Sequence, residues 1–192
     1  MNQIRTFIAL DFPLSILESI EQQTKRLRQT LGDDAIRWVP SHNMHLTLKF
    51  LGNAPISHLD FLKQMLTQVA DSTHPFDLQI GGIGSFPNSN RPRVLWVGLH
   101  APAALVTLQK AIEEGAQRLG YEKEERPFSP HLTLGRVRQG MDGKVLQKIG
   151  NALSTIQLGK IGTARVDSVH LYKSDLNSEG SVYTKLFSTP LR

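Results

Sequence analysis

The sequence predicts a mixed helix-and-strand protein made of two similar lobes with a cleft between them. The first observation is that the tetrapeptide His-Leu-Thr-Leu occurs twice, at His45–Leu48 and His131–Leu134. The second is that strand, helix, motif strand and helix follow in the same order around each copy, at an offset of roughly ninety residues. The third is that no linker, low-complexity tract or long charge run interrupts the chain. A duplication explains this order, and we expect residues 1–192 to form a single domain of two duplicated lobes.

The first half of the chain predicts strand, helix, strand and helix in that order. Ile4 to Leu10 has the apolar composition of a strand, and a helix is expected from Pro13 to a stop at Gly32. The first motif strand then ends at Gly52, and a second helix begins at Ser57. The residues expected on the buried side of this second helix are Phe61, Leu62, Met65, Leu66 and Val69.

The second half repeats the order. Val94 to Leu99 is expected to be a strand, and Ala103 to Leu119 a helix with apolar residues at helical spacing. The second motif strand follows, and after it a shorter helix from about Asp142 to Leu153.

Three more alternating runs are expected to complete the sheets. They are Phe76 to Gly84, Arg165 to Tyr172, and Val182 to Phe187. The first leads into a glycine-rich segment, which we interpret as a bulge and loop, because the Lys-Ser/Thr pair of a phosphate-binding P-loop is missing.

Composition excludes several classes of site. The chain has no cysteine, so disulfides, thiolate metal sites and a cysteine nucleophile are excluded. Its N-terminal apolar run is too short for a membrane span, and no signal-peptide cleavage pattern follows it, so we expect a soluble cytoplasmic protein. The net charge of +5 suits an anionic partner such as a nucleotide or RNA.

The two motifs bring together side chains suited to acid-base chemistry. Side chains two apart on a strand share a face, so each histidine points the same way as the threonine of its motif. A histidine pair can hold one protonated and one neutral imidazole near neutral pH, which supplies an acid and a base. Threonine hydroxyls can donate hydrogen bonds to phosphate oxygens. His45, Thr47, His131 and Thr133 therefore predict cleavage of a phosphodiester that requires no metal.

Residues next to the motifs are further candidates for the cleft. Strict alternation would place Lys49 with the motif residues, either against a bound anion or as a solvated strand lysine. Arg136 would point away from the cleft, but a bulge at Gly135 would turn it towards a phosphate, and we favour this over a surface ion pair. Candidates for stacking on a base, each of which is individually more typical of a core, are Phe50, Phe86 and Phe128.

Competing sites have less support in the sequence. His42 and His45 could belong to a metal site, but no carboxylate lies at a recognisable ligand spacing. A Ser-His-Asp catalytic triad is not supported, because the sequence lacks the Gly-x-Ser-x-Gly motif that positions the nucleophilic serine. The histidines outside the motifs are expected to be structural or at the surface; they are His42, His58, His74, His100 and His170. His42 comes nearest to a role, because its position just before the first motif strand could place it at the rim of the cleft.

The chain resembles the two-histidine phosphoesterase superfamily, and specifically the bacterial and archaeal RNA 2′,3′-cyclic phosphodiesterases formerly called 2′-5′ RNA ligases. The segments that carry the resemblance are RTFIALDFP, HLTLKFLG, IGSFPNSNRPRVLWVG and PFSPHLTLGRVR. The resemblance implies an α+β fold of two pseudo-symmetric lobes, in which antiparallel sheets line a central cleft and helices lie outside.

The resemblance also implies a reaction, the hydrolysis of an RNA 2′,3′-cyclic phosphate to a 2′-phosphate. His45 would be the proton donor to the 3′ oxygen, His131 the proton acceptor from water, and Thr47, Thr133 and Arg136 would bind the phosphate. We expect a monomer without cofactor, metal or membrane partner that acts on RNA ends or cyclic nucleotides, for instance tRNA halves. Two alternatives stay open: 2′-5′ RNA ligation through the same site, and a non-catalytic RNA-binding module.

Overall fold

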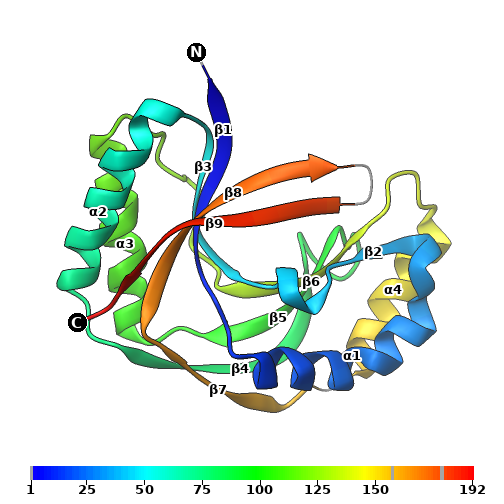
Figure 1. Cartoon of the computed structure of the whole chain (residues 1–192). Helices are drawn as coiled ribbons and strands as arrows, with labels where there is room; N and C mark the ends of the chain where they lie inside the picture. Colours follow the sequence, from blue (N-terminus) through cyan, green and yellow to red (C-terminus); the bar gives the residue numbers. More distant parts are fainter. Residues whose placement is uncertain (1, 157, 178–179) are drawn as a thin grey trace.

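The fold has two antiparallel sheets with helices on their outer sides (Figure 1). Residues of both sheets line a cleft between them. The structure is a computed structural model that describes residues 2–156, 158–177 and 180–192. The four-stranded sheet has the order β3 (Leu46–Pro55), β1 (Gln3–Leu10), β8 (Ser168–Asn177) and β9 (Gly180–Pro190). The five-stranded sheet has the order β2 (Ile36–Trp38), β6 (His131–Val137), β5 (Val94–His100), β4 (Phe76–Phe86) and β7 (Lys160–Val166).

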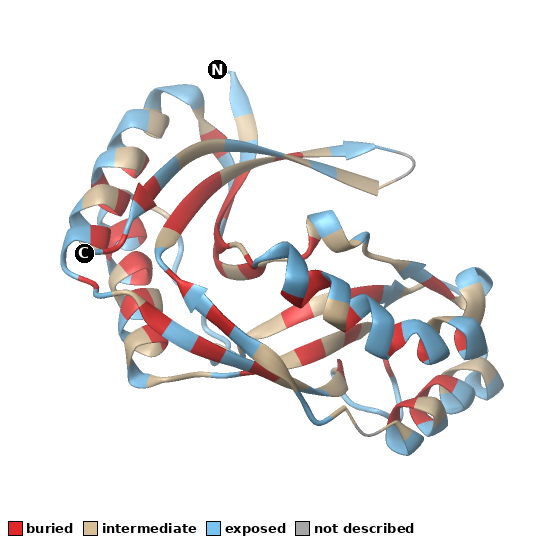
Figure 2. Cartoon of the chain, turned by 60° about the horizontal axis from the view of Figure 1, so that its bottom comes forward, coloured by how far each residue is buried: buried red, intermediate tan, exposed pale blue. Residues whose placement is uncertain are grey.

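Each sheet is covered by a pair of helices. Helices α2 (Leu59–Asp71) and α3 (Ala103–Arg118) pack together on the four-stranded sheet, and α1 (Leu14–Ala35) and α4 (Gly143–Thr155) pack together beside the five-stranded sheet. Short 3₁₀ turns, η1 (Ser41–Asn43) and η2 (Ile56–His58), flank β3. The apolar faces of the helices turn towards the sheets and are buried, as Figure 2 shows. The α+β fold of two lobes with antiparallel sheets is confirmed.

The lobes do not coincide with the two halves of the sequence. Helix α1 comes from the first half but packs on β2 and β7 of the five-stranded sheet, whereas α3 comes from the second half and packs on β3 of the four-stranded sheet. The strands of the two halves are also mixed. Strand β8 of the second half pairs with β1 of the first half, and β4 of the first half pairs with β5 of the second half. Each half therefore contributes helices and strands to both lobes. The origin of this arrangement in a duplication stays a prediction.

Several boundaries differ from the sequence prediction. Helix α1 runs past Gly32, which interrupts the helical geometry with a φ of 69°, and β3 runs past Gly52, which also has a φ of 69°. The run from Arg165 to Tyr172 is not one strand, because it is divided at Asp167 between β7 and β8. Phe61 was expected on the buried side of α2 but is 58% exposed. The short strand β2 was missed altogether.

A β-bulge follows the threonine of each motif. The pairing of β3 with β1 skips Leu48, and the pairing of β6 with β5 skips Leu134. An extra residue in one strand reverses the alternation beyond it. The residue five positions after each motif histidine therefore faces the cleft, namely Phe50 in β3 and Arg136 in β6.

The same reversal buries Lys49 in an ion pair. Its Nζ donates to Oε1 of Glu113 on α3 and to the carbonyl oxygen of Glu122, both at 2.5 Å. The same Oε1 accepts a hydrogen bond from the backbone N–H of Glu124 at 2.9 Å. Lys49 is at the wall of the cleft, but its ammonium group is buried and its charge is matched by Glu113. The alternative of a solvated strand lysine is therefore wrong, and contact with a bound anion stays a prediction that this ion pair does not favour. The ion pair attaches β3 to α3 and to loop 119–130, which leads to the second motif.

This ion pair should contribute to stability in a way that a double variant reveals. The side chains of Lys49 and Glu113 are only 4% and 9% exposed. Lys49→Met is expected to lower the free energy of unfolding by about 3–5 kcal/mol, because it leaves the carboxylate buried without its counter-charge. Lys49→Met combined with Glu113→Leu should recover most of that loss. Urea denaturation measures both, and a single variant as stable as the wild type would contradict the burial described here.

Candidate active site

The residues predicted for the site lie together in one cleft of about 1330 Å³ between the two sheets. His45 and Thr47 come from the first motif, at the start of β3, and His131, Thr133 and Arg136 come from β6. All of them line this cleft. The fold thus brings the two motifs, which are far apart in the sequence, to opposite walls of one space.

Both motif histidines are oriented by the same backbone contact. Nδ1 of His45 donates to the carbonyl oxygen of Asn43 at 2.9 Å, and Nδ1 of His131 donates to that of Ser129 at 2.7 Å. In each case the carbonyl belongs to the residue two positions earlier. A carbonyl oxygen only accepts hydrogen bonds, so Nδ1 carries the proton in both rings. Nε2 is therefore the nitrogen left to exchange a proton with a ligand.

Aromatic rings hold the imidazoles in place. Phe7 of β1 stacks on His45 with ring centroids 4.7 Å apart, and Tyr183 of β9 meets His45 edge-on at 5.1 Å. Phe86, at the end of β4, meets His131 edge-on at 4.9 Å. These contacts restrict ring rotation and place apolar surface against each histidine. The rings are thus fixed both by hydrogen bonds and by packing.

The surroundings lower the pKa of both histidines. Burial is the main cause for each ring, because it disfavours the charged form. The positive charge of Arg136 also lowers both pKa values, and the backbone carbonyls act in the opposite direction. The two rings differ in one respect: the carboxylate of Asp11 raises the pKa of His45, and among the described residues no carboxylate has this effect on His131.

The threonines and Arg136 present free hydrogen-bond donors to the cleft. Within the described residues, neither the hydroxyl of Thr47 or Thr133 nor the guanidinium of Arg136 has a hydrogen-bond partner, although all three side chains line the cleft. The bulge expected near Gly135 is present in β6 and turns Arg136 towards the cleft. Gly135 itself allows a close approach of strands, because a Cβ there would lie 2.7 Å from Cγ2 of Ile36. The site thus offers donors suited to an anion.

The candidate stacking residues also reach the cleft. Phe50, Phe86 and Phe128 all line it. Phe50 is 59% exposed, so the prediction that core packing is its better explanation is wrong. The bulge in β3 explains this position, since it exchanges the faces of Lys49 and Phe50.

Comparison with known proteins agrees with this geometry. The profile of the 2′-5′ RNA ligase superfamily matches residues 16–178. The RNA 2′,3′-cyclic phosphodiesterase of Methanothermobacter thermautotrophicus is 30% identical over 186 residues, which cover 96% of this chain and 97% of that protein. The enzyme of the same name from Methanocaldococcus jannaschii is 33% identical over 180 residues, with coverage of 94% and 96%.

The chain belongs to the 2′-5′ RNA ligase superfamily. Solved structures agree: the protein TT0787 of Thermus thermophilus has a TM-score of 0.81 at 28% identity, with 98% of each chain covered. The structure of E. coli LigT complexed with 3′-AMP has a TM-score of 0.77 at 26% identity, with 99% of each chain covered. The resemblance drawn from the motifs is therefore confirmed at the level of family and fold.

This member of the superfamily has cleft residues that sequence reasoning missed. Arg5 of β1 and Arg37 of β2 both line the cleft, and Asn43 supplies the carbonyl that orients His45. Arg37 carried no signal, because a strand of three residues is too short to show alternation. Asn43 was missed because its contact is made by a backbone atom, which any residue type supplies.

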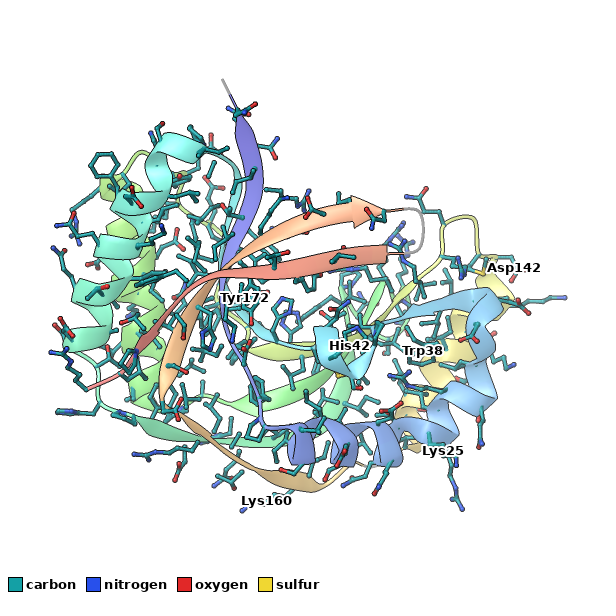
Figure 3. The ribbon with its side chains drawn as sticks, viewed as in Figure 1. Lys25, Trp38, His42, Asp142, Lys160 and Tyr172 are labelled. Atoms are coloured by element: carbon teal, nitrogen blue, oxygen red, sulfur yellow. The ribbon has the colours of Figure 1, made fainter. Side chains whose placement is uncertain are left out.

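The remaining histidines lie elsewhere. His42 is exposed on η1 (labelled in Figure 3) and is not among the residues that line the cleft, so its expected place at the rim is wrong. His170 is buried beside Asp11, with Nε2 3.5 Å from a carboxylate oxygen. Within the described residues, no group of three or more His, Asp or Glu side chains has the arrangement of a metal site. None of the helices described has an apolar stretch long enough for a membrane span.

The histidine pKa values are open to direct measurement. In an NMR titration of the free protein, both motif histidines should show midpoints below the ordinary value of about 6.5, since burial disfavours their charged forms. Arg136→Gln should move both midpoints to higher pH, because it removes a positive charge that lowers both pKa values.

Arg138→Gln is the matched control. Arg138 follows β6, is exposed and does not line the cleft, and its Nε donates to the carbonyl oxygen of Asp33. This variant should leave both midpoints in place. Midpoints that move equally in the two variants would show that Arg136 has no particular effect on the pair.

Proposed function

We propose that this protein hydrolyses the 2′,3′-cyclic phosphodiester at an RNA end to a 2′-phosphomonoester, without a metal, through His45 and His131. The observation that carries the proposal is the matched placement of the two imidazoles, each with Nδ1 bound to a carbonyl and Nε2 left for the substrate. The relatives from M. thermautotrophicus and M. jannaschii, which match nearly the full chain, are named RNA 2′,3′-cyclic phosphodiesterase, which supports the same activity.

In the proposed reaction, one histidine acts as base and the other as acid. Nε2 of His131 takes a proton from water as the water oxygen forms a bond to phosphorus. The bond between phosphorus and the 3′ oxygen breaks, and Nε2 of His45 donates its proton to that oxygen. The products are a 2′-phosphate and a 3′ hydroxyl. His131 is left protonated and His45 neutral, and proton exchange with solvent restores the starting pair.

Thr47, Thr133 and Arg136 would bind the phosphate in this reaction, because each presents a hydrogen-bond donor to the cleft. The hydroxyls of Thr47 and Thr133 would donate to the non-bridging phosphate oxygens, and Arg136 would offset the negative charge that grows on them in the transition state. Because these groups come from opposite walls of the cleft, they can hold the phosphorus between the two imidazoles, as attack opposite the leaving oxygen requires.

The assignment of acid and base is supported by one electrostatic difference. The carboxylate of Asp11 raises the pKa of His45, which favours the protonated form that an acid needs. Asp11 is held by Lys185 at 2.7 Å and by the hydroxyl of Tyr172 at 2.7 Å. Tyr172 is labelled in Figure 3. Arg136 lowers the pKa of both rings, so the carboxylate of Asp11 is the contribution that distinguishes His45 from His131.

Ligation is the second candidate, and the family profile favours keeping it. A 5′ hydroxyl in place of water would attack the same phosphorus, and the same histidines would move the same protons, giving a 2′-5′ linkage. The cleft volume of about 1330 Å³ leaves room beside a terminal nucleotide. Formation of joined product from RNA with a 2′,3′-cyclic phosphate and RNA with a 5′ hydroxyl tests this alternative. The third candidate function is that of a non-catalytic RNA-binding module. We also predict that the protein is monomeric and cytoplasmic.

Removal of either motif histidine tests the mechanism. His45→Ala and His131→Ala should each lower turnover of a 2′,3′-cyclic nucleotide by about 10²–10⁴-fold, the usual contribution of general acid or base catalysis. The assay is run in excess chelator and separates 2′- from 3′-phosphate product. His42→Ala is the control, because His42 is exposed and outside the cleft.

The outcomes separate the alternatives. Activity that the chelator abolishes contradicts the metal-free mechanism. A 3′-phosphate product would reverse the substrate's orientation in the cleft. Tight RNA binding with no turnover by the wild type would favour the binding module, and variants within about tenfold of the wild type would refute paired acid-base catalysis.

A further inference from the structure

Arg37 lies next to Arg136 on the wall of the cleft. Strand β2 pairs with β6 so that Arg37 is directly opposite Arg136. Directly opposed residues of an antiparallel pair point to the same face, with Cβ atoms about 5 Å apart. Both arginines are exposed and both line the cleft. The cleft therefore contains a pair of neighbouring guanidinium groups.

The fold gives no structural reason for Arg37. Like charges directly opposed on neighbouring strands are destabilising. Within the described residues, neither arginine forms an ion pair. The packing of β2 is carried by its other face, where Ile36 is fully buried and Nε1 of Trp38 donates to the carbonyl oxygen of Gly32 at 3.2 Å. Arg37 thus adds a positive charge to the cleft that none of the other described residues balances with an ion pair.

A second anion bound in the cleft would balance the charge of Arg37. In the proposed reaction, the cyclic phosphate is already matched by Arg136, the threonine hydroxyls and the protonated imidazole. Arg37 stands one strand farther out, because β2 is the edge strand beside β6. In an RNA with a 2′,3′-cyclic phosphate, the nearest other anion is the phosphate on the 5′ oxygen of the same nucleotide. A guanidinium binds such a group well, since its donors match two phosphate oxygens.

We propose that Arg37 binds the phosphate on the 5′ side of the terminal nucleotide, so that the cleft selects RNA ends and 5′-phosphorylated nucleotides over cyclic nucleotides with a 5′ hydroxyl. This inference rests on the proposed function and adds a subsite to it. It explains why two arginines are paired across the strands at the cleft wall.

A matched pair of substrates isolates this contact. Adenosine 2′,3′-cyclic phosphate is compared with the same molecule carrying a 5′-phosphate. The 5′-phosphate should raise kcat/KM of the wild type by about tenfold, as expected for one charge-assisted hydrogen-bonded contact. Arg37→Gln should bring this ratio close to one, and Arg37→Lys, which keeps the charge without the paired donors, should restore part of it.

Arg165→Gln is the control for loss of charge. Arg165 lies on β7, the opposite edge strand of the same sheet, and pairs with Asp77 outside the cleft. This variant removes the same net charge and should keep the tenfold ratio. For a short RNA ending in a cyclic phosphate, Arg37→Gln should also reduce the slope of log KM against log salt by about one, which Arg165→Gln should not do.

Each result decides the inference. A wild-type ratio near one overturns it, and so does a ratio that survives in Arg37→Gln or falls equally in Arg165→Gln. If the wild type hydrolyses neither nucleotide nor the short RNA, the proposed function has failed, and calorimetry then decides the subsite without turnover. Adenosine 2′,5′-bisphosphate should bind about tenfold more tightly than adenosine 2′-phosphate, with the difference lost in Arg37→Gln. Equal affinities overturn the subsite.

Discussion

The extra residue in each motif strand decides which side chains reach the cleft. Without the skips at Leu48 and Leu134, alternation would direct the side chain of Lys49 to the same side as His45 and Thr47 and turn Arg136 towards the helices. With them, Lys49 is buried in the ion pair with Glu113 and Arg136 faces the histidines. The positions of Arg136 and Phe50 in the cleft both depend on this local change of register. So does the ion pair of Lys49, which attaches loop 119–130 to β3.

The sequence predicts the site well where side chains alone define it. His-x-Thr on a period-two strand places both groups on one face, and the glycine after the second motif marks a bulge that frees Arg136. No comparable signal precedes Lys49, because the bulge in β3 falls among larger residues, Leu48 and Lys49 themselves. Arg37 could not be predicted for another reason. Its role depends on the pairing of a three-residue strand with a distant one, and local periodicity does not contain that information.

The lobes were predicted, but their composition was not. Amphipathic spacing in α1 and α3 shows that each helix covers a sheet, and it does not say which sheet. In the structure, α1 of the first half packs on β2 of its own half and on β7 of the second half, and α3 of the second half packs on β3 of the first half. The near-symmetry of the lobes is also broken where it matters for chemistry, since Phe50 on one wall occupies the position that Arg136 occupies on the other.

The exchange of α1 and α3 between lobes limits how the chain can be divided. A fragment of either half would expose the sheet face that the other half's helix covers, so neither half can bury its own apolar surface alone. Two copies of one half would solve the problem by covering each other. If the two halves descend from a single shorter chain, two copies of that chain would have had to associate for each to cover the apolar sheet face of the other.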